Sequence, residues 1–305
     1  MTGSMGEVSR SALLSTRRIA LSTAYLSAVT LSLAACAAPP ASKAPAAAPS
    51  AVFAQRTVDT PEASPHLIEF TLGQHRFALP SNYFVDERGP DFQGSVTLAL
   101  LWPELTPYPP GNGYWNQTSG PMRNHGVLVS FNLVNFPIDS LPERYVTVNP
   151  TGDPNDPSYS LALKIHQPDQ FGLTHYMTDL QKMTEYMAKE GGRPAKPSAF
   201  YIGSTPDWFI GRDSQGRIRT VVQCDDSREP EGFEIRDNTL VDIPGSKKRP
   251  LCDGHSFALA KYALVVRASY HRPILRDWQR IEAEVRRIMQ AADRGLTLNA
   301  NGAQP

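Results

Sequence analysis

Alternating hydrophobic and polar residues mark several short strands in the first half of the chain. Residues 66–72 (HLIEFTL) and 75–79 (HRFAL) alternate on either side of a Gly-Gln pair, which predicts a hairpin. Residues 95–102 (SVTLALLW) and 126–136 (GVLVSFNLVNF) are richer in apolar residues and predict buried strands, each followed by a proline. We expect these two strands to lie antiparallel.

The same kind of pattern continues in the second half. Residues 199–202, 207–212 and 217–224 predict successive strands joined by short turns, and residues 256–259 and 262–268 predict a further pair. Shorter strands are expected over residues 160–166 and 233–235.

Two segments repeat hydrophobic residues at helical spacing. Residues 178–190 predict a helix that two glycines close, and a second helix is predicted to begin at Pro273 and end at Gly295. The apolar residues of the second helix recur at steps of four and three: Ile274, Trp278, Ile281, Val285 and Ile288. An apolar stripe of this kind packs on a sheet. We therefore predict the α+β class, with a mainly antiparallel β-sheet, a packing C-terminal helix and long proline-rich loops.

The two buried strands are separated by a long loop, residues 107–126, here called the aromatic loop. It is rich in Pro, Gly and Asn and contains Tyr108, Tyr114 and Trp115. Long loops on a rigid sheet often carry recognition residues. We therefore predict that these three aromatic residues bind a partner. The alternative is that they only pack the loop onto the sheet.

A different pattern occupies the amino-terminal residues. Arg17 and Arg18 precede a mostly apolar run over residues 19–35, which ends in small residues directly before Cys36. This order of charged, apolar and small residues is typical of a secretory signal peptide. The run is short for a membrane span and is interrupted by serines and threonines. Its Leu-Ala-Ala-Cys ending resembles the bacterial lipobox, which implies cleavage before Cys36 and lipidation of the Cys36 thiol.

The residues that follow Cys36 consist largely of Ala, Pro and Ser, with almost no large apolar side chains. Such a stretch cannot bury a core, and it predicts a disordered tether with a reach of roughly 30 Å. The predicted organisation is a signal peptide over 1–35, a tether over 36–65, a folded α+β body over 66–298 and a polar tail over 299–305. A sub-division of the body near residue 195 is left open.

Three cysteines occur in the sequence, and lipidation of Cys36 leaves Cys224 and Cys252 as a pair. In an oxidising periplasm such a pair predicts a disulfide. A metal site is the alternative, because Cys252 and His255 have the C-x-x-H spacing. A structural zinc site usually needs a close pair of ligands at each end, and Cys224 has no close cysteine or histidine. We therefore predict the disulfide and no metal.

Composition and motifs argue against several function classes. The chain has 30 basic and 30 acidic residues, and the predicted signal contains three arginines and one glutamate, which leaves 27 basic and 29 acidic residues. With this balance of charges, the protein lacks the positive field that a nucleic-acid-binding protein needs.

The run Gly-His-Ser-Phe-Ala around Ser256 resembles a nucleophile elbow. An elbow needs a buried strand before the serine and a helix after it, and the sequence predicts neither here. His125, His175 and His255 lack ligand spacing. We expect no cofactor and no enzymatic activity.

Several short segments together resemble lipoprotein immunity proteins. Residues 77–83 (FALPSNY) and 102–108 (WPELTPY) look like the "apolar-Pro-x-Asn-Tyr" and "Pro-x-Leu-x-Pro" segments of bacterial envelope proteins. The C-x-x-H run at Cys252 and the Leu-x-x-Trp run at Leu275 extend the likeness over most of the chain after the signal. The resemblance implies a periplasmic protein that neutralises, by occlusion, an antibacterial effector of type VI or type IV secretion, often a phospholipase.

Two function classes follow from these patterns. The first is a periplasm-facing lipoprotein, held in the membrane through Cys36, that binds and inhibits a secreted effector enzyme such as a phospholipase. Ala37 follows the cysteine, which by resemblance to enterobacterial lipoproteins favours the outer membrane over the inner. The second class is a structural or accessory envelope lipoprotein of a secretion or cell-wall system. A serine hydrolase acting through Ser256 ranks last.

Overall fold

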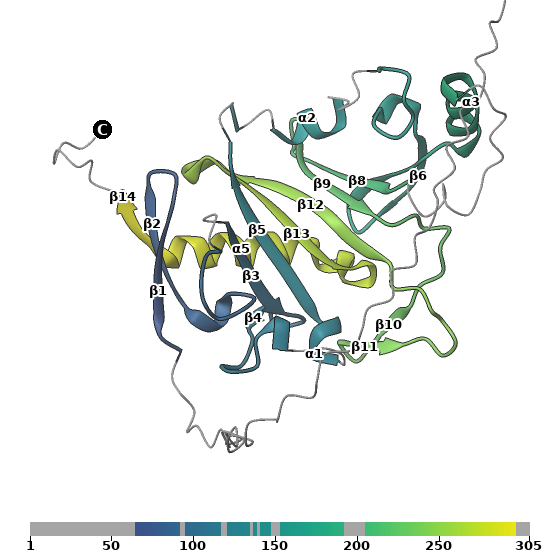
Figure 1. The fold of residues 1–305 in the computed structure, drawn as a ribbon. Coiled ribbons are helices and arrows are strands. Elements are labelled where there is room, and N and C mark those ends of the chain that lie inside the picture. Colours follow the sequence, from purple (N-terminus) through teal and green to yellow (C-terminus); the bar gives the residue numbers. More distant parts are fainter. Residues whose placement is uncertain are drawn as a thin grey trace, which may run out of the picture. The chain divides into compact units, whose positions relative to one another are not determined.

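A computed structural model of the chain describes residues 65–91, 95–116, 121–134, 137–138, 141–147, 153–191 and 205–296. All of them belong to the unit Val58–Pro305. The predicted signal peptide, the tether up to residue 64, the strand over 199–202 and the tail over 299–305 lie outside these residues. Within them the fold is of the predicted α+β class, with antiparallel sheets and a C-terminal helix (Figure 1).

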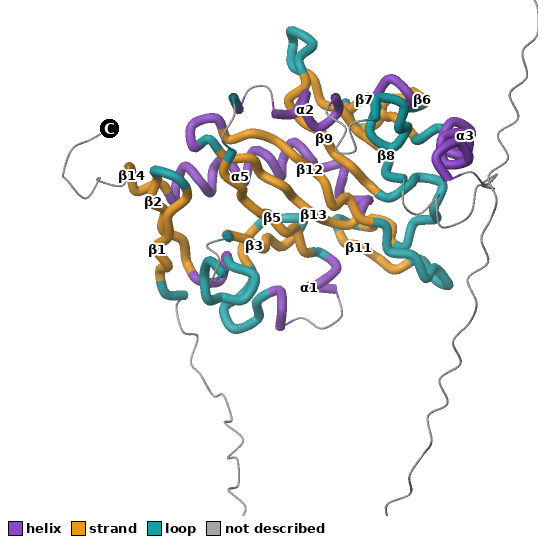
Figure 2. Tube along the Cα trace, turned by 45° about the horizontal axis from the view of Figure 1, so that its top comes forward, coloured by secondary structure: helices purple, strands orange, loops and turns teal. Residues whose placement is uncertain are grey.

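In the described part of the chain, the central element is a nine-stranded antiparallel sheet (Figure 2). Its strand order is β4-β3-β5-β13-β12-β9-β8-β7-β6. The strands are β3 (Val96–Leu101), β4 (Thr106–Pro107), β5 (Gly126–Leu133), β6 (Ile165–Gln170), β7 (Leu173–Met177), β8 (Asp207–Arg212), β9 (Ile218–Cys224), β12 (Leu251–Leu259) and β13 (Leu264–His271). Strands from both sides of residue 195 pair in this sheet, since β5 lies beside β13 and β7 beside β8.

Two smaller sheets also occur among the described residues. The first has the order β1-β2-β14, and the second is a hairpin of β10 and β11. Their strands are β1 (Leu67–Leu72), β2 (His75–Pro80), β14 (Asp293–Leu296), β10 (Phe233–Arg236) and β11 (Thr239–Asp242). The helices are α1 (Pro121–Asn124), α2 (Leu141–Thr147), α3 (Leu180–Gly191) and α5 (Trp278–Ala292). Of the helices in the described ranges, none has both the length and the apolar character that crossing a membrane requires.

The predicted hairpin forms as β1 and β2, with Phe70 opposite Phe77, and the two buried strands pair as β3 and β5. The strand predicted over residues 160–166 is wrong in its position. A 3-10 turn covers Leu161–Leu163, and β6 begins at Ile165, where pairing with β7 begins. β6 tolerates Pro168 because it is the last strand in the order of the sheet, where a missing N–H breaks no ladder.

The central sheet is buried on both faces, which explains the nearly continuous apolar runs of its strands. Phe209 of β8 and Val222 of β9 belong to the core that also contains α5. Trp208 and Ile210 belong to a second cluster, together with Val146 of α2. Successive strand residues point to opposite faces, so a strand covered on both sides has few polar positions.

The C-terminal helix packs on the sheet through its predicted apolar stripe. Ile281, Val285 and Ile288 are almost completely buried, and Figure 1 shows α5 running behind β3, β5 and β13. The predicted boundaries of this helix are wrong at both ends. A 3-10 helix (Arg272–Asp277) precedes it, and it ends at Ala292 instead of Gly295. The chain leaves the helix there because residues 293–296 pair with β2 as β14.

Candidate functional site

The three predicted partner-binding aromatic residues are not equally accessible. Tyr108 is completely buried, and its hydroxyl donates a hydrogen bond to the Met122 carbonyl at 2.6 Å. The carbonyl of Tyr108 accepts a hydrogen bond from the Asn82 side chain at 2.7 Å. Burial also raises the pKa of Tyr108 above its ordinary value. The prediction that Tyr108 contacts a partner is therefore corrected, since its ring ties the two ends of the aromatic loop together.

Trp115 has 55% of its surface exposed, and Tyr114 is half-buried beside it. Their rings meet edge to face with centroids 5.1 Å apart. The Arg123 guanidinium lies 5.3 Å from the Tyr114 ring centroid and 5.9 Å from that of Trp115, within cation-π range. Trp, Tyr and Arg are the residue types that dominate binding energy at protein interfaces. The described loop residues therefore present an interface-like cluster centred on Trp115.

The segment before the aromatic loop holds this cluster in place. The backbone N–H of Trp115 donates to the Val85 carbonyl at 3.2 Å, and that of Gly111 donates to Glu87 Oε2 at 3.0 Å. At Gly126 a β-carbon would lie 2.8 Å from Cε2 of Tyr114, so glycine is needed for β5 to approach that ring. These contacts fix the direction in which the loop presents Trp115.

The disulfide predicted between Cys224 and Cys252 is present in the structure, and both cysteines are completely buried. They lie opposite one another on β9 and β12. The C-x-x-H run lies inside β12, where His255 is hydrogen-bonded through both ring nitrogens. The Tyr270 hydroxyl lies 2.9 Å from Nδ1, and Glu282 Oε1 lies 3.3 Å from Nε2. Among the described residues, no cluster of three or more His, Cys, Asp or Glu side chains could hold a metal ion.

Ser256, the nominal nucleophile, also lies inside β12. It is 4% exposed, and its Oγ lies 3.5 Å from the Gly254 carbonyl. The strand continues to Leu259, so Ser256 does not occupy the strand-to-helix turn on which a nucleophile elbow depends.

A buried polar network connects α5 with the central sheet. The Thr220 hydroxyl donates to Glu282 at 2.5 Å, and Arg286 forms an ion pair with the same carboxylate at 3.2 Å. Burial acts to raise the pKa of Glu282, but the bonds from His255 and Thr220 and the Arg286 charge outweigh it and hold the pKa below its ordinary value. Thr220 and His255 are almost completely buried, so this network ties α5 to the central sheet.

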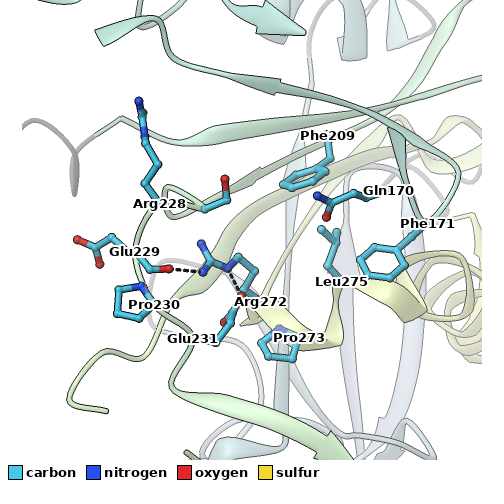
Figure 3. Close-up of a pocket in the computed structure, with 11 residues that line it drawn as sticks. Gln170, Phe171, Phe209, Arg228, Glu229, Pro230, Glu231, Arg272, Pro273 and Leu275 are labelled. Carbon is cyan, nitrogen blue, oxygen red and sulfur yellow. Dashed lines mark hydrogen bonds and ion pairs between the residues drawn. The ribbon is translucent and has the colours of Figure 1, made fainter. Parts of the chain in front are cut away.

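A cavity of about 420 Å³ opens between the β6–β7 turn, the loop 227–231 and the 3-10 helix before α5 (Figure 3). We call it the Phe171 cavity. One wall is mainly apolar and consists of Phe171, Phe209 and Leu275, with the Gln170 amide among them. The opposite wall is the loop 227–231, so the cavity combines a hydrophobic surface with a hydrogen-bonded loop.

Arg272 holds the loop wall of this cavity. Its side chain is 8% exposed and bonds to Glu231 at 2.5 Å. It also donates to the carbonyl oxygens of Asp225, Asp226 and Glu229 at 2.7–2.8 Å. A guanidinium that bonds three carbonyls and one carboxylate fixes the backbone of a loop, because its donors lie in a rigid plane. The loop wall is therefore preformed.

Sequence reasoning did not identify the Phe171 cavity. Its walls come from segments far apart in the chain, since Phe171 and Trp278, which bond to one another, are separated by 107 positions. The one local signal is the Phe-Gly pair of residues 171–172, at a turn where Asn-Gly or Asp-Gly is usual.

The chain matches no protein-family model and no curated protein. Among solved structures, it is similar to an immunity protein of the Stenotrophomonas maltophilia type IV secretion system, with 26% sequence identity and a TM-score of 0.64. The similarity covers 76% of this chain and 94% of that protein. It is consistent with the resemblance to immunity proteins that the sequence indicates.

Proposed function

We propose that this protein is an immunity protein that binds a secreted antibacterial effector and blocks it by occlusion. The observation that carries the proposal is the similarity to the type IV secretion immunity protein, which extends over 94% of that protein. A nearly neutral composition and a surface cluster centred on Trp115 also fit a protein partner. Inhibition by occlusion needs no catalytic group of its own, which agrees with the position of Ser256 inside a strand.

In this proposal the protein acts in the periplasm, anchored through a lipid on Cys36, and in the outer membrane in preference to the inner. The lipobox over residues 33–36 supports lipidation, and the tether would give the body a reach of roughly 30 Å. A phospholipase is the candidate effector, because an enzyme that acts on phospholipids works at the surface to which the inhibitor is held. Anchoring would raise the local concentration of the inhibitor at that surface.

The contact surface in this proposal is the cluster of Trp115, Tyr114 and Arg123. A stable inhibitory complex typically buries about 1,600 Å² in total, and a few fully covered aromatic or arginine residues supply most of its energy. Trp115 is exposed while its backbone N–H is bonded to the Val85 carbonyl, so this residue would lose little backbone freedom on binding.

Survival of toxin-sensitive cells tests the function. The full chain should protect a cell from the periplasmic toxin encoded beside its gene, and a variant that lacks residues 1–35 should not protect it. If correctly folded and exported protein neither protects nor binds any such toxin, the accessory envelope lipoprotein becomes the better hypothesis.

The contact surface is tested by comparing Trp115→Ala with Leu133→Ala. Both side chains are a little more than half exposed, but Leu133 is the last residue of β5 and Trp115 lies in the 3-10 turn Tyr114–Asn116 of the aromatic loop. We expect Trp115→Ala to weaken toxin binding by roughly tenfold or more, as measured by calorimetry, because an interfacial Trp is usually a dominant contact. Leu133→Ala should leave the affinity unchanged. Equal affinities for both variants would remove the Trp115 cluster from the interface.

A further inference from the structure

The turn between β6 and β7 places an aromatic ring at an unusual backbone position. Phe171 has φ 53° and Gly172 has φ 77°, which matches the two positive values of a type I′ hairpin turn. Asn is usual at the first of these positions, because a bulky side chain in the left-handed region is strained. Phe171 is nevertheless 53% exposed, so its ring buries less apolar surface than a phenylalanine in the core would.

The turn is held against α5. The indole N–H of Trp278 donates to the Phe171 carbonyl at 3.0 Å, and Gln170 pairs with Leu173 across the turn. This bond involves only the backbone of Phe171, so it does not depend on the ring. The position of the turn is therefore fixed independently of the aromatic side chain that it carries.

The ring forms the rim of the Phe171 cavity. Figure 3 shows Phe171, Phe209 and Leu275 along one side, facing the loop 227–231. Phe209 and Leu275 are almost completely buried, whereas Phe171 is open to solvent. The apolar wall thus continues from the core out to the surface.

The charged residues around the cavity are paired within the chain. Arg272 is paired with Glu231, Arg228 with the buried Asp226, and Glu229 with Lys248 at 2.9 Å. Figure 3 shows the side chains of Arg228 and Glu229 directed away from the apolar wall. A charged ligand would lose its hydration at this wall and meet charged groups that are already ion-paired, although Glu231 Oε2 is buried without a hydrogen-bond partner. The charge distribution therefore complements an uncharged, apolar group.

We propose that the Phe171 cavity receives an uncharged apolar side chain from the bound effector protein, with Phe171 covering it at the rim. The identity of the partner rests on the proposed function. A preformed pocket with an exposed aromatic residue at its edge is the usual setting of an interface anchor. It also loses little conformational freedom on binding, since Arg272 and Trp278 already hold both walls. Binding of such a side chain would explain why a strained position of the turn carries an aromatic residue, although the fold does not need one there.

Phe171→Asn distinguishes a binding role of the ring from a packing role, because the two roles predict opposite results for stability and for affinity. Asn followed by Gly is the preferred type I′ pair, so a turn freed of strain should unfold at the same or a higher urea concentration. Affinity for the effector should fall by roughly tenfold or more. If the ring serves only to pack the core, the variant loses stability and its folded form keeps its affinity, which would overturn the proposal. Ser227→Trp, which fills the cavity from the loop wall, should weaken binding similarly.

A second measurement does not depend on the effector. The purified full chain is titrated with the amides of N-acetyl-leucine and N-acetyl-phenylalanine, and with those of N-acetyl-aspartate and N-acetyl-lysine as charged controls. NMR of the Leu275 methyl groups should detect the two apolar amides and neither charged amide, and Ser227→Trp should abolish the response. No response to the apolar amides, or an equal response to the charged ones, would overturn the proposal. If the wild type binds no toxin, the proposed function fails, and this titration still decides the occupant of the cavity.

Discussion

Lys164 is a charged residue in the interior of the protein. Its side chain is almost completely buried, its Nζ donates to the Thr178 hydroxyl at 2.8 Å and the ammonium group lies 4.6 Å from the centre of the Trp208 ring. Burial lowers the pKa of Lys164 to about 8, although the charge of Asp207 acts in the opposite direction. Keeping the ammonium charged in this environment therefore reduces stability at neutral pH.

Replacing Lys164 should change how stability depends on pH. The folded protein releases this proton near pH 8, whereas the unfolded chain holds it up to the ordinary lysine value of 10.5. The unfolding free energy of the wild type should therefore rise relative to that of Lys164→Met between these two values, by up to about 3 kcal/mol. Urea unfolding measured from about pH 7 to about pH 10 checks this. Lys182→Met, at an exposed lysine of α3, should follow the wild type throughout. Parallel curves for the wild type and Lys164→Met would contradict the prediction.

At the scale of elements, the disulfide joins β9 to β12 near the middle of the central sheet. It connects residues 28 positions apart, so it limits the freedom of the unfolded chain more than a short loop would. We expect Cys224→Ala/Cys252→Ala to lower the unfolding free energy by about 3 kcal/mol. Urea unfolding measures the loss, and reduction of the wild type should add about two daltons and lower its stability similarly. Two free thiols in native, metal-free protein would contradict the prediction.

The strand β14 should stabilise the end of α5. Asp293, its first residue, accepts hydrogen bonds from Lys261 at 2.7 Å and from Tyr262 at 3.3 Å, and it pairs with Phe77 of β2. A chain that ends at Ala292 should lose about 2 kcal/mol of unfolding free energy, since these bonds are lost. A chain that ends at Leu296 keeps them and is the matched control. Equal thermal midpoints for the two truncations would mean that β14 contributes nothing to stability.

At the scale of the whole molecule, the body and its anchor have separable roles. The described residues form one folded unit, and the proposed lipid attachment lies outside them at Cys36. Cys36→Ser should release the body into the soluble periplasm or leave an unprocessed precursor, since only the thiol can take the lipid. Cell fractionation and sensitivity of processing to globomycin measure this. Unchanged membrane association of the variant would remove the lipoprotein hypothesis.

Local pattern was sufficient for much of the fold. The alternation of residues 66–72 and 75–79 predicted the first hairpin, and the stripe of Ile281, Val285 and Ile288 predicted a helix packed on a sheet. The remaining pair of cysteines predicted the disulfide between Cys224 and Cys252. These predictions succeeded because periodicity and cysteine pairing depend on the chemistry of nearby or unique residues.

Tertiary contacts decided the features that matter for binding. Tyr108 and Trp115 lie in the same loop, yet Tyr108 is completely buried, with its hydroxyl bonded to the Met122 carbonyl, while Trp115 is exposed. No local pattern distinguishes the two rings. The Phe171 cavity likewise exists only once the β6–β7 turn meets residues about a hundred positions later in the chain. The sequence by itself determined the first hairpin, the buried strands β3 and β5 and the apolar stripe of α5, whereas the start of β6 and the end of α5 depended on pairing with β7 and β2. The packing of distant segments decided which aromatic side chains remain at the surface, because burial depends on partners that a linear pattern does not specify.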